Sequence, residues 1–174
     1  MSGGVFFDTN ILLYQFDNDS ALKQTVARER VAKAWRERNG LISYQVLNEF
    51  MVNMQRKVRD PVQVARARAD VIAFAAWNPV VTDRALLEHA WKLQDRYQFS
   101  YWDAQIVAAA LRAEAATLLS EDMHAGLTIP HRTGELTWAN PFVLGIAQVA
   151  ATYEAAPTLK RSRGPKKPIR QTPR

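Results

Sequence analysis

Short apolar runs of strand length recur along this chain, and they constrain its fold more than any other feature. The predicted strands cover residues 5–7, 41–43, 80–82, 117–120 and 136–138. Longer segments with helical patterns separate most of these runs. Because strands that alternate with helices are typical of parallel sheets, the sequence predicts an α/β fold in which helices flank a largely parallel sheet of short strands.

Helical patterns fill the segments between these runs, in places with two helices between neighbouring strands. The predicted helices cover residues 11–16, 21–38, 44–58, 60–77, 84–97 and 102–115. We expect one compact domain over residues 1–142. One more helix could form over residues 143–156, whereas residues 157–174 are too rich in proline and cations to build a core.

The positive charge of the chain is concentrated at its C-terminal end. The net charge is +6, yet residues 157–174 carry seven cations and no acid, which leaves −1 for residues 1–156. The cations are Lys160, Arg161, Arg163, Lys166, Lys167, Arg170 and Arg174. We expect this tail to attract RNA through its phosphates without reading the bases, although a merely solubilising end explains the composition equally well.

Several functional classes are excluded or disfavoured by what the sequence lacks. It contains no cysteine, which excludes disulfides and thiolate metal sites. No run of about 18 apolar residues occurs, so we expect no membrane span. The first residues lack the basic and apolar regions of a secretory signal. These features favour a cytoplasmic protein with no membrane partner.

Polar and acidic side chains follow three of the predicted strands at their carboxyl ends. Asp8 comes directly after the first strand. Ser43 ends the second strand, six residues before Glu49, and Ser120 ends the fourth, two residues before Asp122. Ligands of open α/β sheets bind outside the carboxyl ends of the strands. We therefore expect these groups to converge on one edge of the sheet.

A fourth acid, Asp103, lies near the middle of the apolar face of its predicted helix, where an unpaired carboxylate is costly. It also completes a capping box with Ser100, and both roles can hold together. The other acids have alternative roles as well. Asp8 and Asp122 can cap helical turns, and Glu49, which points away from the apolar stripe of its helix, can be an exposed surface group.

Four carboxylates in one cleft repel one another unless a cation neutralises them. Hard cations such as Mg²⁺ and Mn²⁺ prefer oxygen ligands, and a bound ion of this kind can polarise a phosphate and activate water. The histidines, His89, His124 and His131, lack the paired spacing of metal ligands. The acids therefore indicate a carboxylate site for a hard divalent cation.

Four segments, in order along the chain, resemble the acidic motifs of PIN-domain nucleases, and most of all those of VapC-type toxins from bacterial toxin–antitoxin pairs. The segments are residues 5–12, 43–50, 100–104 and 119–123, with 140–142 resembling the end of the family domain. The extension after Phe142 is longer than in such toxins, so the resemblance says nothing about the tail.

The resemblance implies a PIN-like three-layer fold and hydrolysis of RNA phosphodiesters by metal-activated water. It implies Mg²⁺ or Mn²⁺ held by Asp8, Glu49, Asp103 and Asp122. It further implies a cognate antitoxin and a homodimer. The supporting polar groups would be Thr9, Asn10, Ser43 and Ser120.

Three other functions compete with this one. An aspartate-based phosphatase would use Asp8 as nucleophile, but such enzymes carry a second aspartate two residues later, where this chain has Asn10. A non-catalytic RNA-binding or interaction module would not need the acids. A DNA-directed PIN-like nuclease would use the same cleft, because the carboxylates do not distinguish ribose from deoxyribose.

Overall fold

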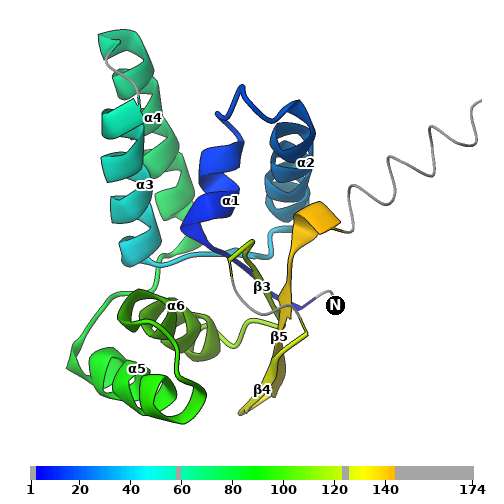
Figure 1. Ribbon diagram of the computed structural model, residues 1–174, viewed down its shortest axis with the longest axis vertical. Helices are drawn as coiled ribbons and strands as arrows, with labels where there is room; N and C mark the ends of the chain where they lie inside the picture. The colour runs from blue at the N-terminus through cyan, green and yellow to red at the C-terminus, as the bar shows by residue number, and fades with distance from the viewer. Residues whose placement is uncertain (1–2, 58–59, 123–125, 144–174) are drawn as a thin grey trace, which may run out of the picture.

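A five-stranded sheet in the order β2-β1-β3-β5-β4 forms the centre of the protein. The structure, a computed structural model, describes residues 3–57, 60–122 and 126–143 (Figure 1). Its strands are β1 (Val5–Phe7), β2 (Gly40–Leu41), β3 (Thr117–Leu119), β4 (Thr128–His131) and β5 (Gly134–Ala139). β1 pairs in parallel with β2 and β3, and β3 pairs in parallel with β5. The predicted short-stranded, largely parallel sheet is confirmed.

Helices flank this sheet and pack against one another in pairs. They are α1 (Thr9–Tyr14), α2 (Ala21–Glu37), α3 (Tyr44–Lys57), α4 (Pro61–Phe74), the 3-10 helix η1 (Ala75–Trp77), α5 (Arg84–Tyr97) and α6 (Tyr101–Arg112). Figure 1 shows α3 beside α4 and α5 beside α6, as two helical hairpins, and α1 packs on both α2 and α3. The carboxyl ends of the parallel strands face the space between these helices.

Two of the predicted strands differ from the structure. β2 covers residues 40–41 instead of 41–43, because only Gly40 and Leu41 pair with β1. The chain then leaves β1, and the backbone N–H of Val80 donates to the Ile42 carbonyl at 2.9 Å. The strand predicted over residues 80–82 is wrong, since Val80 forms only a single bridge with Ser43.

The sheet ends in a hairpin whose first strand was not predicted. β4 pairs antiparallel with β5, and His131 and Gly134 face each other across a two-residue turn. The strand predicted over residues 136–138 is confirmed as part of β5. The sequence did not predict β4, because this strand contains Pro130 and a proline normally argues against a strand. Proline is tolerated here because β4 lies at the edge of the sheet.

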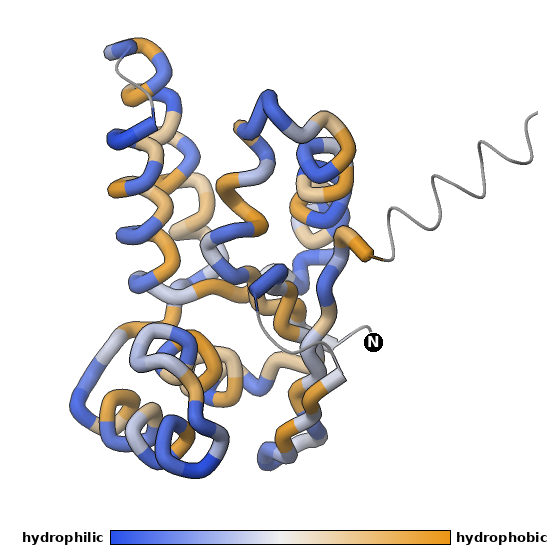
Figure 2. Tube along the Cα trace, viewed as in Figure 1, coloured by the Kyte–Doolittle hydropathy of each residue, from blue (hydrophilic) through white to orange (hydrophobic). Residues whose placement is uncertain are grey.

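The core lies between the sheet and the helices. The buried apolar side chains form one continuous cluster that includes Phe6, Phe7, Phe50 and Leu118. In α6, every residue from Ala104 to Leu111 is buried, as expected of a helix that is apolar on most sides. Figure 2 shows polar and apolar residues alternating along α3, which buries one face only.

The C-terminal expectations fall outside this description. The further helix predicted over residues 143–156 and the basic tail at 157–174 lie beyond the described residues, apart from Val143. Within the described part of the chain, no helix is both long enough and apolar enough to cross a membrane.

Candidate active site

Asp8 lies where β1 ends and α1 begins, and it serves both elements. Its backbone N–H donates to the Leu119 carbonyl of β3 at 3.0 Å, which extends the sheet by one residue. Its Oδ1 accepts from the backbone N–H of Thr9 at 2.6 Å, as an N-cap residue does. This cap explains why α1 begins at Thr9, two residues before the predicted start. Asp8 therefore caps a helix and also points into the carboxylate edge of the sheet.

The end of β3 faces Asp8 directly. The hydroxyl of Ser120 donates to Asp8 Oδ2 at 2.6 Å. The side-chain amide of Asn10 donates to Asp8 Oδ2 at 3.2 Å and to Asp122 Oδ2 at 3.0 Å. One NH₂ group thus bridges two carboxylates that stand 114 residues apart in the chain. The structure thus brings the strand-end groups Asp8, Ser120 and Asp122 together, with Asn10 between them.

Glu49 joins this cluster from α3. Its Oε2 accepts from the hydroxyl of Thr9 at 2.8 Å, and its Oε1 accepts from the amide of Gln45 at 2.9 Å. The same Gln45 amide donates to the backbone carbonyl of Trp102 at 3.3 Å, which ties α3 to α6. Glu49 does point away from the apolar stripe of its helix, but it enters a cleft instead of open solvent.

Asp103 stands on the α6 side of the cleft. Its backbone N–H donates to Ser100 Oγ at 3.1 Å, and the Ser100 hydroxyl donates to Asp103 Oδ2 at 2.7 Å. The predicted pairing of these two residues at the start of α6 is therefore present. No hydrogen bond among the described residues links Asp103 to the other three acids, although its charge contributes to raising the pKa of Asp8.

Ser43 takes a different role from the other predicted supporting groups. It is 1% exposed, and its hydroxyl accepts from the backbone N–H of Val46 at 3.3 Å, in the first turn of α3. None of its described contacts reaches a carboxylate. It acts on the cleft only by holding the start of the helix that carries Glu49.

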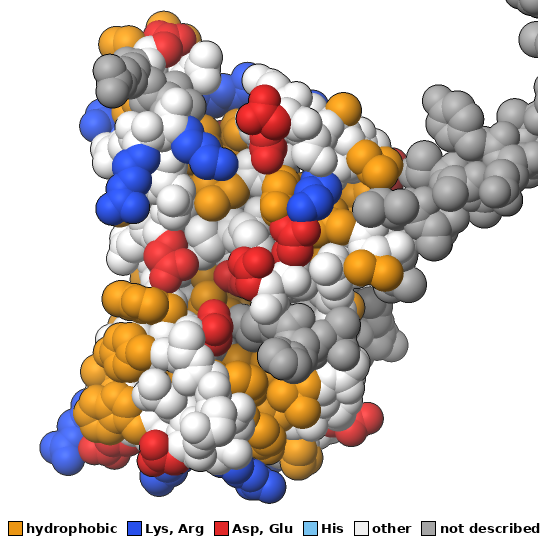
Figure 3. All heavy atoms as spheres, viewed as in Figure 1, with side chains coloured by type: hydrophobic (Ala, Val, Ile, Leu, Met, Phe, Trp, Pro, Cys, Tyr) orange, Lys and Arg blue, Asp and Glu red, His pale blue; other side chains and the backbone are white. Residues whose placement is uncertain are grey.

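The electrostatics of the cleft show most clearly at Asp8. Burial raises the pKa of its carboxyl to about 6, against hydrogen bonds from Ser120 and Thr9 that lower it, and the negative charges of Glu49 and Asp103 raise it further. Only 6% of Asp8 is exposed. Figure 3 shows several acidic side chains gathered across the middle of the viewed face. Carboxylates that share a site without a cation repel one another, and this repulsion is what the raised pKa of Asp8 reflects in part.

The donor chemistry of the cleft suits a hard cation, but the side chains are not closed around one. Carboxylate oxygens are available, and the buried Oδ1 of Asn10 has no hydrogen-bond partner. Oxygen donors of this kind are preferred by Mg²⁺ and Mn²⁺. Among the described residues, however, no three acidic or histidine side chains form a group that could hold a metal ion. In this conformation, the carboxylate oxygens accept hydrogen bonds from Thr9, Asn10 and Ser120.

Glu121, next to Asp122, belongs to a separate ion-pair network that the sequence did not reveal. It forms an ion pair with Lys23 of α2 and accepts a hydrogen bond from the Tyr14 hydroxyl of α1. Burial raises the pKa of Glu121, but these two contacts outweigh burial and hold that pKa below its usual value. The network fixes the chain immediately before Asp122, and Lys23 also lies 4.6 Å from the centre of the Tyr14 ring.

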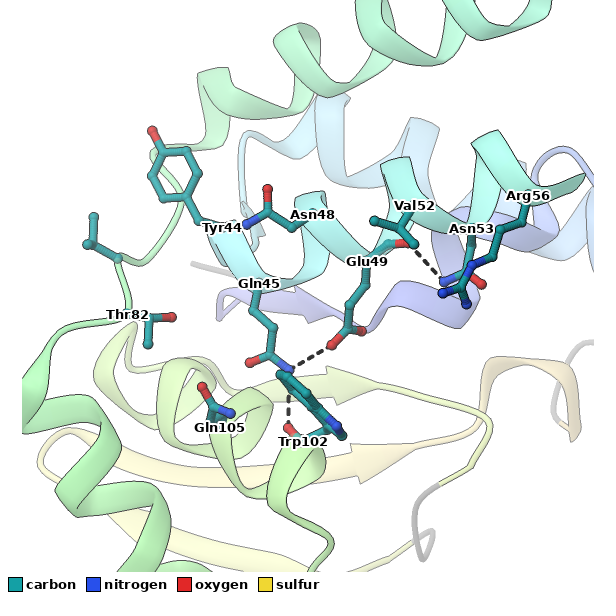
Figure 4. A pocket seen from close by; sticks show the side chains of 11 residues that line it. Tyr44, Gln45, Asn48, Glu49, Val52, Asn53, Arg56, Thr82, Trp102 and Gln105 are labelled. Atoms are coloured by element: carbon teal, nitrogen blue, oxygen red, sulfur yellow. Dashed lines mark hydrogen bonds between the residues drawn. The ribbon is translucent and has the colours of Figure 1, made fainter. Parts of the chain in front are cut away.

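An open groove of about 930 Å³ adjoins the cleft on the far side of Glu49 (Figure 4). Its walls are α3 and the start of α6, with Val81 and Thr82 beside them. Sequence reasoning missed the groove residues Gln45, Trp102 and Gln105. The only available signal was spacing, since Gln45 stands one turn before Glu49, and Trp102 and Gln105 stand one turn apart on α6.

Comparisons with known proteins agree with this architecture. The family model of the PIN domain matches residues 5–125. Comparison with curated protein sequences finds no match. A chain of a toxin–antitoxin complex from Klebsiella pneumoniae is similar in structure, with a TM-score of 0.57 and 22% identity, over 79% of this chain and 98% of that one.

A second similar structure is the VapC20 toxin of Mycobacterium tuberculosis, described as cleaving the sarcin–ricin loop. It has a TM-score of 0.50 and 19% identity, over 66% of this chain and 87% of that one. At such identities these likenesses concern the fold, whereas the family match covers well over half of the sequence. The chain belongs to the PIN-domain family.

Proposed function

We propose that this protein is a metal-dependent endoribonuclease and the toxin of a toxin–antitoxin pair. The observation that carries the proposal is the bridge between the two strand ends, in which the Asn10 amide donates to the carboxylates of both Asp8 and Asp122 while the Ser120 hydroxyl donates to that of Asp8. Glu49 reaches the same edge through Thr9. PIN-domain membership and the likeness in fold to two toxin-related structures support the same function.

Asp8, Glu49, Asp103 and Asp122 would hold Mg²⁺ or Mn²⁺. When bound, the cation would polarise a phosphodiester and lower the pKa of a water molecule that attacks it. The protein contributes the positions of the ligands. Ser120 and the backbone N–H of Thr9 fix the Asp8 carboxylate, Gln45 and Thr9 fix that of Glu49, and Ser100 fixes that of Asp103.

A cleavage assay with the purified full-length chain tests this function. Labelled RNAs and DNAs of the same sequence are incubated with Mg²⁺, Mn²⁺ or EDTA, and the cleaved ends are mapped. We expect cleavage of RNA with either cation and none in EDTA. Full activity of a folded Asp8→Asn protein in EDTA would contradict the metal mechanism. Equal cleavage of DNA would reassign the substrate, and no cleavage of either would favour a binding module.

The toxin role predicts a protein partner. An acidic cleft is a natural target for an inserted arginine or lysine of an antitoxin, since a cationic side chain can replace the metal ion. Glu49 and Asp122 are the expected contacts. Expression without the antitoxin should arrest growth, and Asp8→Asn should relieve the arrest. Normal growth with abundant soluble wild-type protein would contradict the toxin role. We further propose a homodimer, which sedimentation of the purified protein tests.

The basic tail is proposed to strengthen RNA binding without choosing the cleavage site. The cations concerned are Lys160, Arg161, Arg163, Lys166, Lys167 and Arg170. Truncation after Ala156 should weaken binding most at low salt and flatten its salt dependence, by at most roughly 5 in the log–log slope if these six cations and Arg174, seven in all, meet phosphates. The cleavage position should not change, because phosphate contacts do not read bases. Equal affinity and slope for both chains would show that the tail does not bind RNA.

A further inference from the structure

The groove beside Glu49 has the features of a binding site that the cleavage chemistry does not use. It runs along α3 from Tyr44 to Arg56, past Glu49, and faces Trp102 and Gln105 of α6 (Figure 4). Residues that follow one another at helical spacing line the α3 wall, so one continuous face of that helix is left open. The groove therefore passes directly beside a proposed metal ligand, Glu49.

Gln105 is the strongest sign that the groove receives a ligand. The residue is only 4% exposed, yet its Nε2 has no hydrogen-bond partner and none of its side-chain atoms makes a hydrogen bond within the described part of the protein. Leaving a buried amide unpaired is costly. Rotation of the amide exchanges its nitrogen and oxygen with little change of shape, so it can offer either a donor or an acceptor.

Trp102 supplies the second feature, an aromatic surface left open to solvent. It lies at the mouth of the groove, and 60% of it is exposed to solvent. Tyr101 contacts it edge-on, with ring centres 5.2 Å apart, and so restricts its position. Unpaired bases of single-stranded RNA stack on exposed aromatic side chains of this kind and are read through hydrogen bonds to their edges.

The remaining walls combine apolar surface from Tyr44, Val52 and Val81, on which a base can pack, with polar groups that can pair with a nucleotide. Four amide side chains line the groove, those of Gln45, Asn48, Asn53 and Gln105. Arg56 stands at the end away from Glu49 and forms no ion pair with any described residue, which leaves its charge available for a phosphate. Aromatic stacking surface, amides and a distal cation together match a stacked base, its polar edge and a phosphate further along the same strand.

We propose that this groove binds one unpaired nucleobase of the RNA substrate next to the cleaved bond, stacked on Trp102 and read by Gln105. The inference rests on the proposed ribonuclease function and names the residues that would select the cleavage site. Gln45 has a positioning role, because its amide holds both Glu49 and the Trp102 carbonyl. Arg56 contacts a phosphate further along the strand.

Binding without cleavage separates this inference from the function on which it rests. Fluorescein-labelled oligomers of A, C, G or U are titrated with the full-length protein in EDTA, and anisotropy is measured. Trp102→Ala should weaken binding about tenfold, and Trp102→Phe should retain most of the affinity. Trp91→Ala is the matched control, since Trp91 is 50% exposed on α5 and outside the groove. Gln105→Leu should reduce the difference in affinity among the four oligomers. Thermal unfolding verifies that each variant is folded.

The cleavage map with Mg²⁺ provides the second measurement. In a long RNA of mixed sequence, Gln105→Leu should relax the base preference at one position beside the cut, while Trp91→Ala leaves the map unchanged. If the wild type cleaves RNA but Trp102→Ala and Gln105→Leu keep both its affinities and its map, the inference is wrong and the ribonuclease function stands. If those variants bind and cleave RNA as the wild type does but no longer bind a co-expressed protein partner, the groove is the binding site of that partner and the inference is wrong. If the wild type neither binds nor cleaves RNA, both proposals fail.

Discussion

The two sides of the cleft hold their polar groups in opposite ways. On the sheet side, Asp8, Asn10 and Ser120 are joined to one another by hydrogen bonds of 2.6–3.4 Å, and Asp8 is nearly inaccessible to solvent. On the groove side, Gln105 is unpaired and Trp102 is largely exposed. Groups fixed before the substrate arrives suit the chemical step, whereas unpaired groups gain their partners only from a ligand.

This difference predicts that substitutions on the two sides separate cleavage from binding. Sheet-side changes should alter the rate, the pKa of Asp8 or the stability of the empty site. Groove-side changes should alter affinity and base preference. Each of the following predictions tests one part of that division.

The largest effect is expected from Asp8→Asn. The substitution keeps the shape and the helix cap but removes a charge from the cation site, so cleavage should fall on the order of a thousandfold. RNA affinity in EDTA should not fall, because the change lies on the sheet side and removes a negative charge. Cleavage rates and anisotropy test both statements. Asp95→Asn, an exposed acid of α5, is the control. A matching loss of affinity would break the division between the two sides.

The same substitution should stabilise the metal-free protein at neutral pH. Burial raises the pKa of Asp8 to about 6 from 3.8, so the folded protein binds this proton more tightly than the unfolded chain. The contribution of Asp8 therefore favours folding at low pH and is lost as the pH rises from about 3.8 to about 6. Asp8→Asn should raise the free energy of unfolding at pH 7 by up to about 3 kcal/mol. Urea unfolding in EDTA should show this gain disappearing below pH 4, and a gain independent of pH would contradict it.

A smaller effect is expected from Ser120→Ala. Its hydroxyl donates to Asp8 Oδ2 and lowers the pKa of that carboxyl, so its removal should move the pKa further above 6. Carboxyl-detected NMR titration of the metal-free protein measures the shift directly. A pKa that stays in place or moves down would show that this hydrogen bond does not tune Asp8.

The smallest effect is expected from Ser43→Ala, which is a matched change because Ser43 and Ser120 are both 1% exposed. Loss of the bond to the Val46 N–H should cost about 1 kcal/mol of stability, as for other helix caps. The pKa of Asp8 should not move. If Ser43→Ala shifted it as Ser120→Ala does, Ser43 would have to be counted among the groups that support the carboxylates.

The sequence predicted those parts of the fold and the site that local patterns determine. The apolar run at residues 5–7 is followed at once by a polar residue, so both the strand β1 and the position of Asp8 at its end could be read. The Ser100-x-x-Asp103 spacing likewise revealed the start of α6 within one residue. Asp60 and Pro61 did the same for α4, where Asp60 accepts from the Val62 N–H.

The remaining features depend on contacts between distant segments, which no local pattern encodes. Val80 has the sequence of a strand, but its only β-pairing within the described residues is a single isolated bridge with Ser43. Glu49 alone had the pattern of a surface group, and only the packing of α1 beside α3 brings it to Thr9. The role of Gln45 depends on α6 passing close to α3. Ser43 and Ser120 both end predicted strands, yet only the pairing of β1 with β3 brings Ser120 to Asp8.

The edges of the sheet restrict how another protein can attach to this one. One edge is β2, which has two residues, and the other is β4, where Pro130 has no N–H to donate. A strand from a second chain would find too few backbone groups on either edge to extend the sheet. Inhibitors of this protein are therefore better designed as short helices or as cationic side chains that enter the cleft than as extended peptides.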